Sequence, residues 1–362
     1  MMLARFLLHF QDIAGINVLK YITFRTALAG VTALLVSILL GTKFIYFLKS
    51  IKAAQPILGD APKTHQDKQG TPTMGGLLII FSILVACILW VDLTNASVLL
   101  CLFALVTFGG VGLLDDYKKL LKKDNLGLKG RQKIFLMIIL SFIIAVMVIQ
   151  FDQRGPSSLA IAFPFLKDFH PYIGLWMVPW IMLVIIGTSN GVNLTDGLDG
   201  LAAGTIVIAA SAFTILIYVS SNIKLANYLA VPYVASASEL TVVMGAVAGA
   251  ALGFLWFNAH PAEIFMGDTG SLSLGAILGT AAILIKQEII ILLVGGVFFL
   301  ESLSVILQVG SFRLRKGRRI FRMAPFHHHM ELSGLPETKV VIRLWIVAII
   351  LCLLGLSSLK LR

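Results

Sequence analysis

Three groups of aspartate residues stand where long apolar segments of the chain end. They are Asp115 and Asp116 in LLDDYKK, Asp196 and Asp199 in NLTDGLDG, and Asp268 in MGDTGS. The 362-residue chain holds only 18 Asp and Glu residues, so this grouping is a strong signal. A carboxylate near hydrocarbon is costly unless it is hydrated, paired or bound to a metal. Several carboxylates at one membrane face therefore predict a divalent-cation site at the water boundary.

The adjacent pair Asp115 and Asp116 can do two different jobs. Neighbouring residues on a helix point about 100° apart, so one carboxylate can face a metal or a proton while the other faces a lysine. A carboxylate at such a place can act as a general base. The alternative is a hydrated acidic helix end beside Lys118 and Lys119. The pair alone leaves both interpretations open.

The segment SNGVNLTDGLDGLAAG carries polar side chains at every third residue: Asn190, Asn193, Asp196 and Asp199. In a helix or a tight turn this spacing keeps them on one side. Glycines such as Gly197 permit a close approach of a ligand to the backbone. Such a polar stripe between apolar segments predicts a binding surface, and the alternative is a hydrated turn in which Asn and Asp act as caps.

Asp268 stands between two small residues just before another apolar segment, in EIFMGDTGSLSLG. It could cap a helix that begins near Ser271. An ionised Asp is also a hard oxygen ligand for Mg²⁺, which usually takes one or two carboxylates together with substrate phosphates. Phe265 could stack on a base, or it could be an interface anchor.

Two further segments suggest that the ligand is anionic. THQDKQGTPTMGG places Lys68 and Thr73 before an apolar segment, where lysine and backbone N–H groups suit phosphate. MAPFHHHMELSG contains His327, His328 and His329, which could bind an anion or form a surface tract; no Cys or spaced His completes a zinc site. Together, the carboxylates, the lysines and a divalent cation indicate phosphoryl transfer to an acceptor in the membrane.

The elements that position these residues are predicted to be membrane-spanning helices. Hydrophobic residues make up 58% of the chain and charged residues 13%, whereas about 25% is typical of a water-soluble domain. We expect an all-α polytopic membrane protein with one domain over residues 1–362, in which 1–22 forms an interfacial N-terminal segment. The ten predicted spans are 23–47, 73–93, 96–114, 132–151, 173–189, 200–220, 240–257, 271–286, 288–311 and 340–359.

The basic residues orient these spans in the membrane. Most of the 29 Lys and Arg residues fall in the loops on the side of the aspartates, which is therefore predicted to be cytoplasmic, with both termini on the periplasmic side. The net charge of +11 is explained mainly by this bias. No nucleic-acid-binding motif is present, and membrane lipid surrounds the predicted helices. The three cysteines lie in apolar runs and predict neither a disulfide framework nor a zinc site.

On the motifs THQDKQGTPTMGG, LLDDYKK, NGVNLTDGLDGLAAG, EIFMGDTGSLSLG and MAPFHHHMELSG, the chain resembles the muramoyl-peptide branch of the polyprenyl-phosphate N-acetylhexosamine-1-phosphate transferase superfamily. The resemblance implies transfer of phospho-N-acetylmuramoyl-pentapeptide from UDP-N-acetylmuramoyl-pentapeptide to undecaprenyl phosphate. The implied products are lipid I and UMP, and the implied cofactor is Mg²⁺. It also implies ten spans, periplasmic termini and a homodimer.

The same resemblance implies roles for individual residues. Asp268 would be the Mg²⁺ ligand, and Asp115 would be the base for the lipid phosphate, with Asp116 beside it; a covalent phospho-Asp route stays open. The implied substrate contacts are Lys68, Gly197, Leu198, Asp199 and Phe265 for uracil, Thr73, Asn193 and Asp196 for ribose and phosphate, with Asn190 in the same stripe, His327 and His328 for the sugar-peptide end, and Lys119, Lys129 and Lys133 for phosphate.

Two other functions stay open at this stage. A related transferase would move N-acetylglucosamine-1-phosphate to the same lipid, although the triple-His tract is similar to the muramoyl-peptide branch. A secondary transporter would place its ionisable groups near the bilayer midplane. The predicted position of the acids at the span ends favours catalysis over transport.

Overall fold

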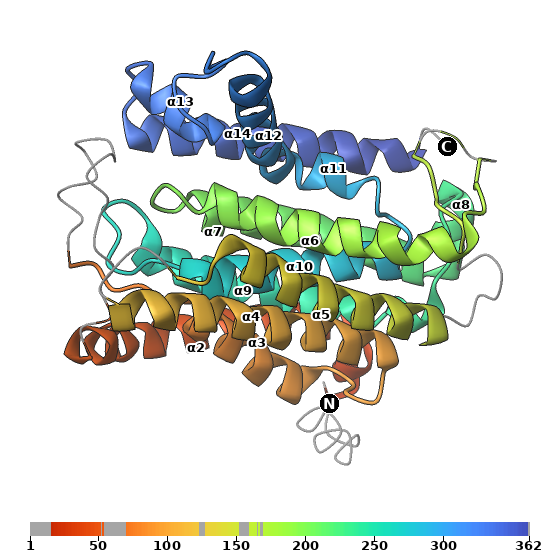
Figure 1. The fold of residues 1–362 in the computed structure, drawn as a ribbon. Coiled ribbons are helices and arrows are strands. Elements are labelled where there is room, and N and C mark those ends of the chain that lie inside the picture. The colour runs from red at the N-terminus through yellow and green to blue at the C-terminus, as the bar shows by residue number, and fades with distance from the viewer. Residues whose placement is uncertain are drawn as a thin grey trace.

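The computed structural model describes residues 16–51, 53, 70–122, 127–151, 159–164, 166 and 169–360. In these residues the regular structure is helical, with no strand and an isolated β-bridge between Ala160 and Tyr172 (Figure 1). The prediction of an all-α polytopic membrane protein is confirmed. The predicted interfacial segment lies largely outside the described residues; its end forms the short 3₁₀ helix η1, Ile16–Lys20.

Long helices occupy the places of all the predicted spans. They are α2 (Ile22–Ser50), α3 (Gly76–Trp90), α4 (Ala96–Lys122), α5 (Gly130–Phe151), α6 (Met177–Thr195), α7 (Leu201–Ser221), α9 (Leu240–Asn258), α10 (Gly267–Leu284), α12 (Gly296–Leu314) and α14 (Glu337–Ser357). The short helices are η4 (Gly174–Trp176), α8 (Ile223–Leu229), η5 (Ala235–Ala237), α11 (Ile291–Val294), α13 (Phe326–Leu332) and η6 (Ser358–Lys360).

Eight helices of the described part are long and apolar enough to cross a membrane. The other two long helices are α3, which has only 15 residues, and α10. Every residue of α10 from Thr269 to Leu284 is buried inside the protein, so this helix can be rich in Gly, Ser and Thr without facing lipid. The count of ten spans therefore stays a prediction.

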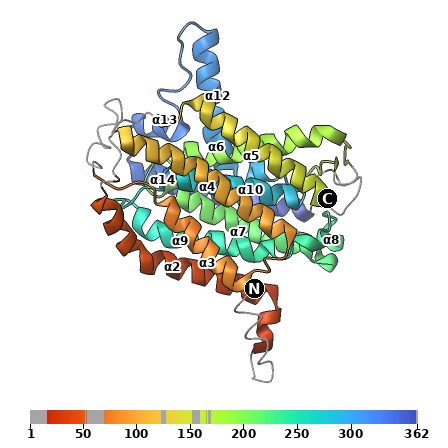
Figure 2. The same cartoon turned by 60° about the horizontal axis from the view of Figure 1, so that its bottom comes forward.

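Two boundaries differ from the sequence prediction in ways that matter. The segment 96–114 continues as helix α4 to Lys122, so Asp115 and Asp116 lie within the helix and not after its end. The segment 288–311 is divided into α11 and α12 at Gly295, whose backbone leaves the helical conformation (φ −94°, ψ 24°). Helix α12 then projects from the bundle before the chain returns to α13 (Figure 2).

Helix α10 is the centre of the bundle, and α3, α4 and α6 pack along it (Figures 1 and 2). Glycines let these helices approach closely. A Cβ added to Gly112 on α4 would lie 2.2 Å from the carbonyl oxygen of Asp268, and one added to Gly76 on α3 would lie 2.0 Å from the amide of Gly270. These contacts bring the end of α4 against the start of α10.

An ion pair ties the helices together at the end of the bundle remote from the aspartates. Arg25 at the start of α2 lies 2.7 Å from the carboxylate of Glu239, which precedes α9, and donates to the carbonyl of Trp90 at the end of α3 (3.2 Å). Because these charge-assisted bonds hold both terminal nitrogens of a buried guanidinium, they fix the positions of three helices relative to one another.

We predict that Gly112→Ala destabilises the protein, because the new methyl group meets backbone atoms that cannot rotate away. Overpacking of this kind costs about 1–3 kcal/mol. The control is Gly110→Ala on the same helix, where an added Cβ meets nothing within 4 Å. Thermal unfolding of the purified protein in detergent should give a lower midpoint for the first variant only. Equal midpoints would contradict the close approach of α4 and α10.

Candidate active site

Asp116 joins α4 to the start of α10. Its carboxylate accepts hydrogen bonds from the amide of Asp268 (3.2 Å), the amide of Thr269 (3.0 Å) and the hydroxyl of Thr269 (2.7 Å). The residue is 1% exposed. A carboxylate in this place satisfies N–H groups that the first turn of a helix leaves without partners. Asp116 therefore positions α10, a role that the sequence prediction of a second acid beside the base did not include.

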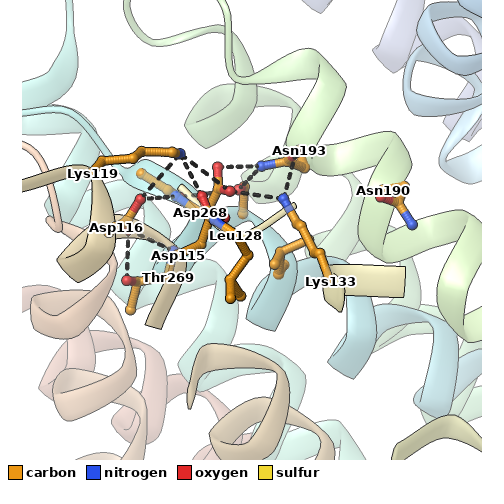
Figure 3. A network of polar contacts seen from close by, with 12 residues as sticks. Asp115, Asp116, Lys119, Leu128, Lys133, Asn190, Asn193, Asp268 and Thr269 are labelled. Atoms are coloured by element: carbon orange, nitrogen blue, oxygen red, sulfur yellow. Dashed lines mark hydrogen bonds and ion pairs between the residues drawn. The ribbon is translucent and has the colours of Figure 1, made fainter. Parts of the chain in front are cut away.

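Asp115 faces the neighbouring carboxylate of Asp268 across a shared lysine (Figure 3). Lys119, one turn further along α4, places its Nζ 2.7 Å from Asp115 Oδ2 and 3.3 Å from Asp268 Oδ2. The other oxygen of Asp115 accepts from the amide of Leu128 (2.8 Å). The helical continuation of α4 thus produces an Asp–Lys pair at i,i+4, the spacing at which helical side chains meet.

Asp268 is also held from α5 and α6. Lys133 Nζ lies 2.7 Å from Asp268 Oδ2, and Asn193 donates its amide hydrogen to Asp268 Oδ1 (2.9 Å) and to the hydroxyl of Ser271 (2.9 Å). Three carboxylates and two ammonium groups therefore share one site built from four helices (Figure 3). Opposite charges in contact offset much of the cost of removing them from water.

The donor atoms suit a hard divalent cation. The side chains of Asp115, Asp116 and Asp268 offer oxygens that all lie within 4.8 Å of one another. Because Asp116 accepts bonds from α10, the oxygens of Asp115 and Asp268 beside Lys119 are the ones that a cation could share with a substrate phosphate. Lys119 and Lys133, at the same place, carry the positive charge that phosphate oxygens require.

A second polar cluster surrounds Asp199 in the turn between α6 and α7. Asp199 Oδ2 lies 3.0 Å from Nδ1 of His260 and accepts from the amide of Ala262 (3.2 Å), while the amide of Asp199 donates to Glu337 at the start of α14 (2.9 Å). The three side chains could also hold a metal ion by distance. The hydrogen bonds of Asp199 hold this turn against the loop before α10 and against the start of α14.

The other residues of the polar stripe lie in different surroundings. Asp196 follows α6, and burial together with the charges of Asp268 and Asp116 raises its pKa to about 7. Asn190 lies apart from the network and donates to the carbonyl of Ile186 within its own helix (Figure 3). Leu198 is buried in a small apolar cluster that includes Leu201.

His327 in α13 lies between α12 and the turn from Asp196 to Gly200 that joins α6 to α7 (the acidic turn). Its Nδ1 lies 3.2 Å from Oε2 of Glu301, its backbone amide donates to the same oxygen (3.3 Å), and both side chains are fully buried. A Cβ added to Gly197 would lie 2.3 Å from His327 Nε2, so the imidazole rests against this glycine. His328 lies 2.8 Å from Glu331 in the same helix.

The remaining predicted residues are spread around these clusters. Thr73 is buried, and its hydroxyl would lie 2.9 Å from a Cβ added to Gly267. Phe265 is half-buried, and its backbone bonds to Pro72 and Gly75 hold the start of α3. Lys129 is exposed and precedes α5. Lys68 lies outside the described residues.

Sequence reasoning missed several polar residues of these clusters: Thr269, His260, Glu301 and Glu337. Glu301 carried a usable signal, because an ionisable residue inside an apolar span is costly and therefore usually has a partner. His260 in NAHPAE and Glu337 after a proline had no such signal, since both are common residues in a polar loop. Only the fold brings them to Asp199.

Comparisons with known proteins agree with this arrangement. The chain matches the family model described as Glycosyl transferase family 4 over residues 97–286, from α4 to the end of α10, and the phospho-N-acetylmuramoyl-pentapeptide-transferase signature 1 over residues 68–80. It is 53% identical to the phospho-N-acetylmuramoyl-pentapeptide-transferase of Desulforapulum autotrophicum over 97% of both chains. It is 52% identical to the protein of that name from Oleidesulfovibrio alaskensis over 96% of both chains.

We predict that the effects of substituting Glu301 and His327 on the free energy of unfolding are not additive. Glu301→Leu leaves a buried imidazole without its partner, and His327→Phe leaves a buried carboxylate without its partner; losing one side of such a pair costs about 3–5 kcal/mol. The double variant should lose clearly less than the sum of the two. Thermal unfolding midpoints of the four proteins measure this, and strictly additive losses would show that the two side chains do not interact.

Proposed function

The chain belongs to the phospho-N-acetylmuramoyl-pentapeptide-transferase family, and on this basis we propose what it does. It transfers phospho-N-acetylmuramoyl-pentapeptide from its UDP carrier to undecaprenyl phosphate, forming lipid I and UMP in peptidoglycan synthesis. The observation that carries the proposal is the single cluster of Asp115, Asp116, Asp268, Lys119 and Lys133. Acids and lysines gathered in this way suit phosphoryl transfer.

The products define the bonds that change. Because UMP leaves with one phosphate, the bond from the sugar-linked phosphorus to the oxygen that bridges the two phosphorus atoms breaks, and this oxygen leaves with UMP. A new P–O bond forms between the sugar-linked phosphorus and an oxygen of the lipid phosphate. The attacking oxygen must carry no proton, and the leaving phosphate gains negative charge that nearby cations must stabilise.

Asp115 is the residue that we assign to the proton. Its carboxylate lies 2.7 Å from the Lys119 ammonium group, and in its ionised form it can accept a proton from the lipid phosphate. Lys119 and Lys133 present ammonium groups at the same place, where they hold phosphate oxygens and offset their charge. Asp116 positions these groups through its bonds to α10.

We propose Mg²⁺ as the cation of this site, with Asp268 as its protein ligand and Asp115 close enough to share it. The donor set supports this choice, since carboxylate oxygens in a charge-rich pocket are the ligands that Mg²⁺ prefers. When bound, Mg²⁺ would neutralise diphosphate oxygens and make the phosphorus easier to attack. Asn193 keeps Asp268 in place through a 2.9 Å hydrogen bond.

The nucleotide lies, in this proposal, along the turn after α6. Gly197, Leu198 and Asp199 form the boundary of the uracil site, with Phe265 beside it, and Lys68 is a further uracil contact expected from the sequence. Thr73, Asn193 and Asp196 lie toward ribose and phosphate, and Asn190 and Lys129 are placed at the margin of the site. His327 and His328 lie toward the sugar-peptide end; the contact of His327 with Gly197 supports this order.

The protein is a bacterial membrane protein, and its orientation follows from charge. We propose the cytoplasmic membrane, with the acidic cluster facing the cytoplasm and both termini facing the periplasm, because the basic loops lie on the side of the cluster. A homodimer is a further part of the proposal. Lys118→Cys and Lys224→Cys variants, treated with a membrane-impermeant thiol reagent, test the orientation: the first should react from the cytoplasmic side only and the second from the periplasmic side only.

The function is tested by release of UMP from purified protein in detergent with undecaprenyl phosphate. We expect release from UDP-N-acetylmuramoyl-pentapeptide, loss of release when EDTA removes divalent cations, and recovery on addition of Mg²⁺. UDP-N-acetylglucosamine is the control donor and should not react. Reaction of that donor alone would identify a transferase of the other branch, and binding without UMP release would favour transport.

We predict that substitutions of Asp268 and of Asp115 change the kinetics of the enzyme in different ways. Asp268→Ala should lower turnover by at least about a hundredfold at any Mg²⁺ concentration, because the metal ligand is lost. Asp115→Asn keeps the side-chain size and should lower kcat by about 10²–10⁴-fold, the usual contribution of a positioned base, while the affinity for the nucleotide-sugar changes little. A defect of Asp115→Asn confined to nucleotide affinity would make Asp115 a binding residue.

A further inference from the structure

A pocket of about 720 Å³ lies between the projecting end of α12 and the chain that returns from it to α13. Apolar side chains of α12 and α13 form one part of its wall, among them Val305, Val309 and Leu332. Another part is formed by arginines from the end of α12 and from the returning segment: Arg313, Arg319 and Arg322. Figure 2 shows how α12 stands away from the bundle here.

The pocket is held in shape by side chains of α12. Gln308 accepts from the amides of Ile320 (3.0 Å) and Phe321 (3.0 Å) and donates to the carbonyl of Phe321 (2.9 Å). One turn further, the hydroxyl of Ser311 donates to the carbonyl of Arg318 (3.0 Å). The backbone of the returning segment, which carries Arg319 and Arg322, is therefore fixed against the helix.

The arginines differ in what they already bind. The guanidinium of Arg322 donates to the carbonyl of Leu332, and its backbone amide donates to His329 Nδ1 (3.2 Å). Arg313 and Arg319 have no hydrogen-bond or ion-pair partner among the described residues. Two guanidinium groups beside an apolar wall suit a ligand that joins a carboxylate to small apolar groups, because guanidinium binds carboxylate in a bidentate manner.

Helix α13 joins this pocket to the site of phosphoryl transfer. His327, in the first turn of α13, rests against Gly197 in the acidic turn, whereas Leu332 at the end of the helix lines the pocket. A substrate that has its nucleotide at the acidic turn and extends along α13 reaches the arginines with its far end. In a muramoyl-peptide, the peptide is attached through its amino end and so finishes in a carboxylate.

We propose that this arginine pocket binds the carboxylate end of the peptide stem of the nucleotide substrate. The inference rests on the proposed function and adds a specificity site to it. It assigns Arg313 and Arg319 a role that the other basic residues of the same segment do not have. Arg315 and Arg318 are equally exposed but do not line the pocket, so a general attraction to the membrane surface should depend on all four alike.

The test compares two double variants that remove the same charge. Arg313→Gln/Arg319→Gln should weaken binding of UDP-N-acetylmuramoyl-pentapeptide by about tenfold or more, the effect of losing a charge-assisted bond worth about one decade in affinity. Arg315→Gln/Arg318→Gln should bind like the unchanged protein. Both doubles should bind UDP-N-acetylmuramic acid without peptide equally well, which shows that the nucleotide site is intact. Calorimetry in detergent measures all of these affinities.

A second experiment removes the other partner of the proposed contact, the terminal carboxylate of the peptide stem. When the terminal carboxylate of the stem is converted to an amide, the unchanged protein should lose the same factor, and the Arg313/Arg319 double variant should lose nothing further. If amidation of the substrate weakened binding to the Arg313/Arg319 double variant as much as to the unchanged protein, the inference would be overturned. Equal effects of the two double variants on binding of the pentapeptide substrate would also overturn it. A change confined to the dependence on phosphatidylglycerol in nanodiscs would assign the pocket to lipid. Absence of UMP release with intact peptide-dependent binding would overturn the proposed function alone.

Discussion

The bond from the Asp116 carboxylate to the first turn of α10 is the interaction on which the rest of the site depends. It joins α4, which carries Asp115 and Lys119, to the helix that begins with Asp268. Gly267 makes it possible: its φ is +73°, and a Cβ there would lie 2.7 Å from Asp116 Oδ2. A residue with a side chain would be strained at this φ and would also push α10 away from the carboxylate.

Once these helices are joined, charge determines what the site can hold. Three carboxylates with two lysines leave a net negative charge, which attracts a divalent cation, while the lysines are available for phosphate. Each buried charge is costly alone, and together they are tolerated because every one has a partner within hydrogen-bonding distance. The residues are therefore in position before substrate arrives, which is the condition for electrostatic stabilisation of a phosphoryl transfer.

Much of this was predictable from the sequence, because membrane helices follow from hydropathy and isolated aspartates at their ends carry a high cost. The class of fold, the approximate place of each long helix and the convergence of Asp115, Asp116 and Asp268 follow from these two constraints. That the adjacent aspartates can have different roles was also predictable, but which of them binds α10 was not, since this depends on how far α4 continues as a helix and which carboxylate then faces α10. The break at Gly295 was also not predictable, because glycine is common within membrane helices.

The residues that sequence reasoning missed show where the limit lies. Glu301 and His327 are 26 positions apart, and Asp199 and Glu337 are 138 apart. Neither pair has a local pattern, and each forms only because α12 and α14 pack beside the turn after α6. Such pairs fix the orientation of α13 and of the acidic turn, so the part of the site around Asp199 depends on C-terminal helices that contribute no aspartate to it. A change in α12 can therefore alter substrate binding without touching the groups that transfer phosphate.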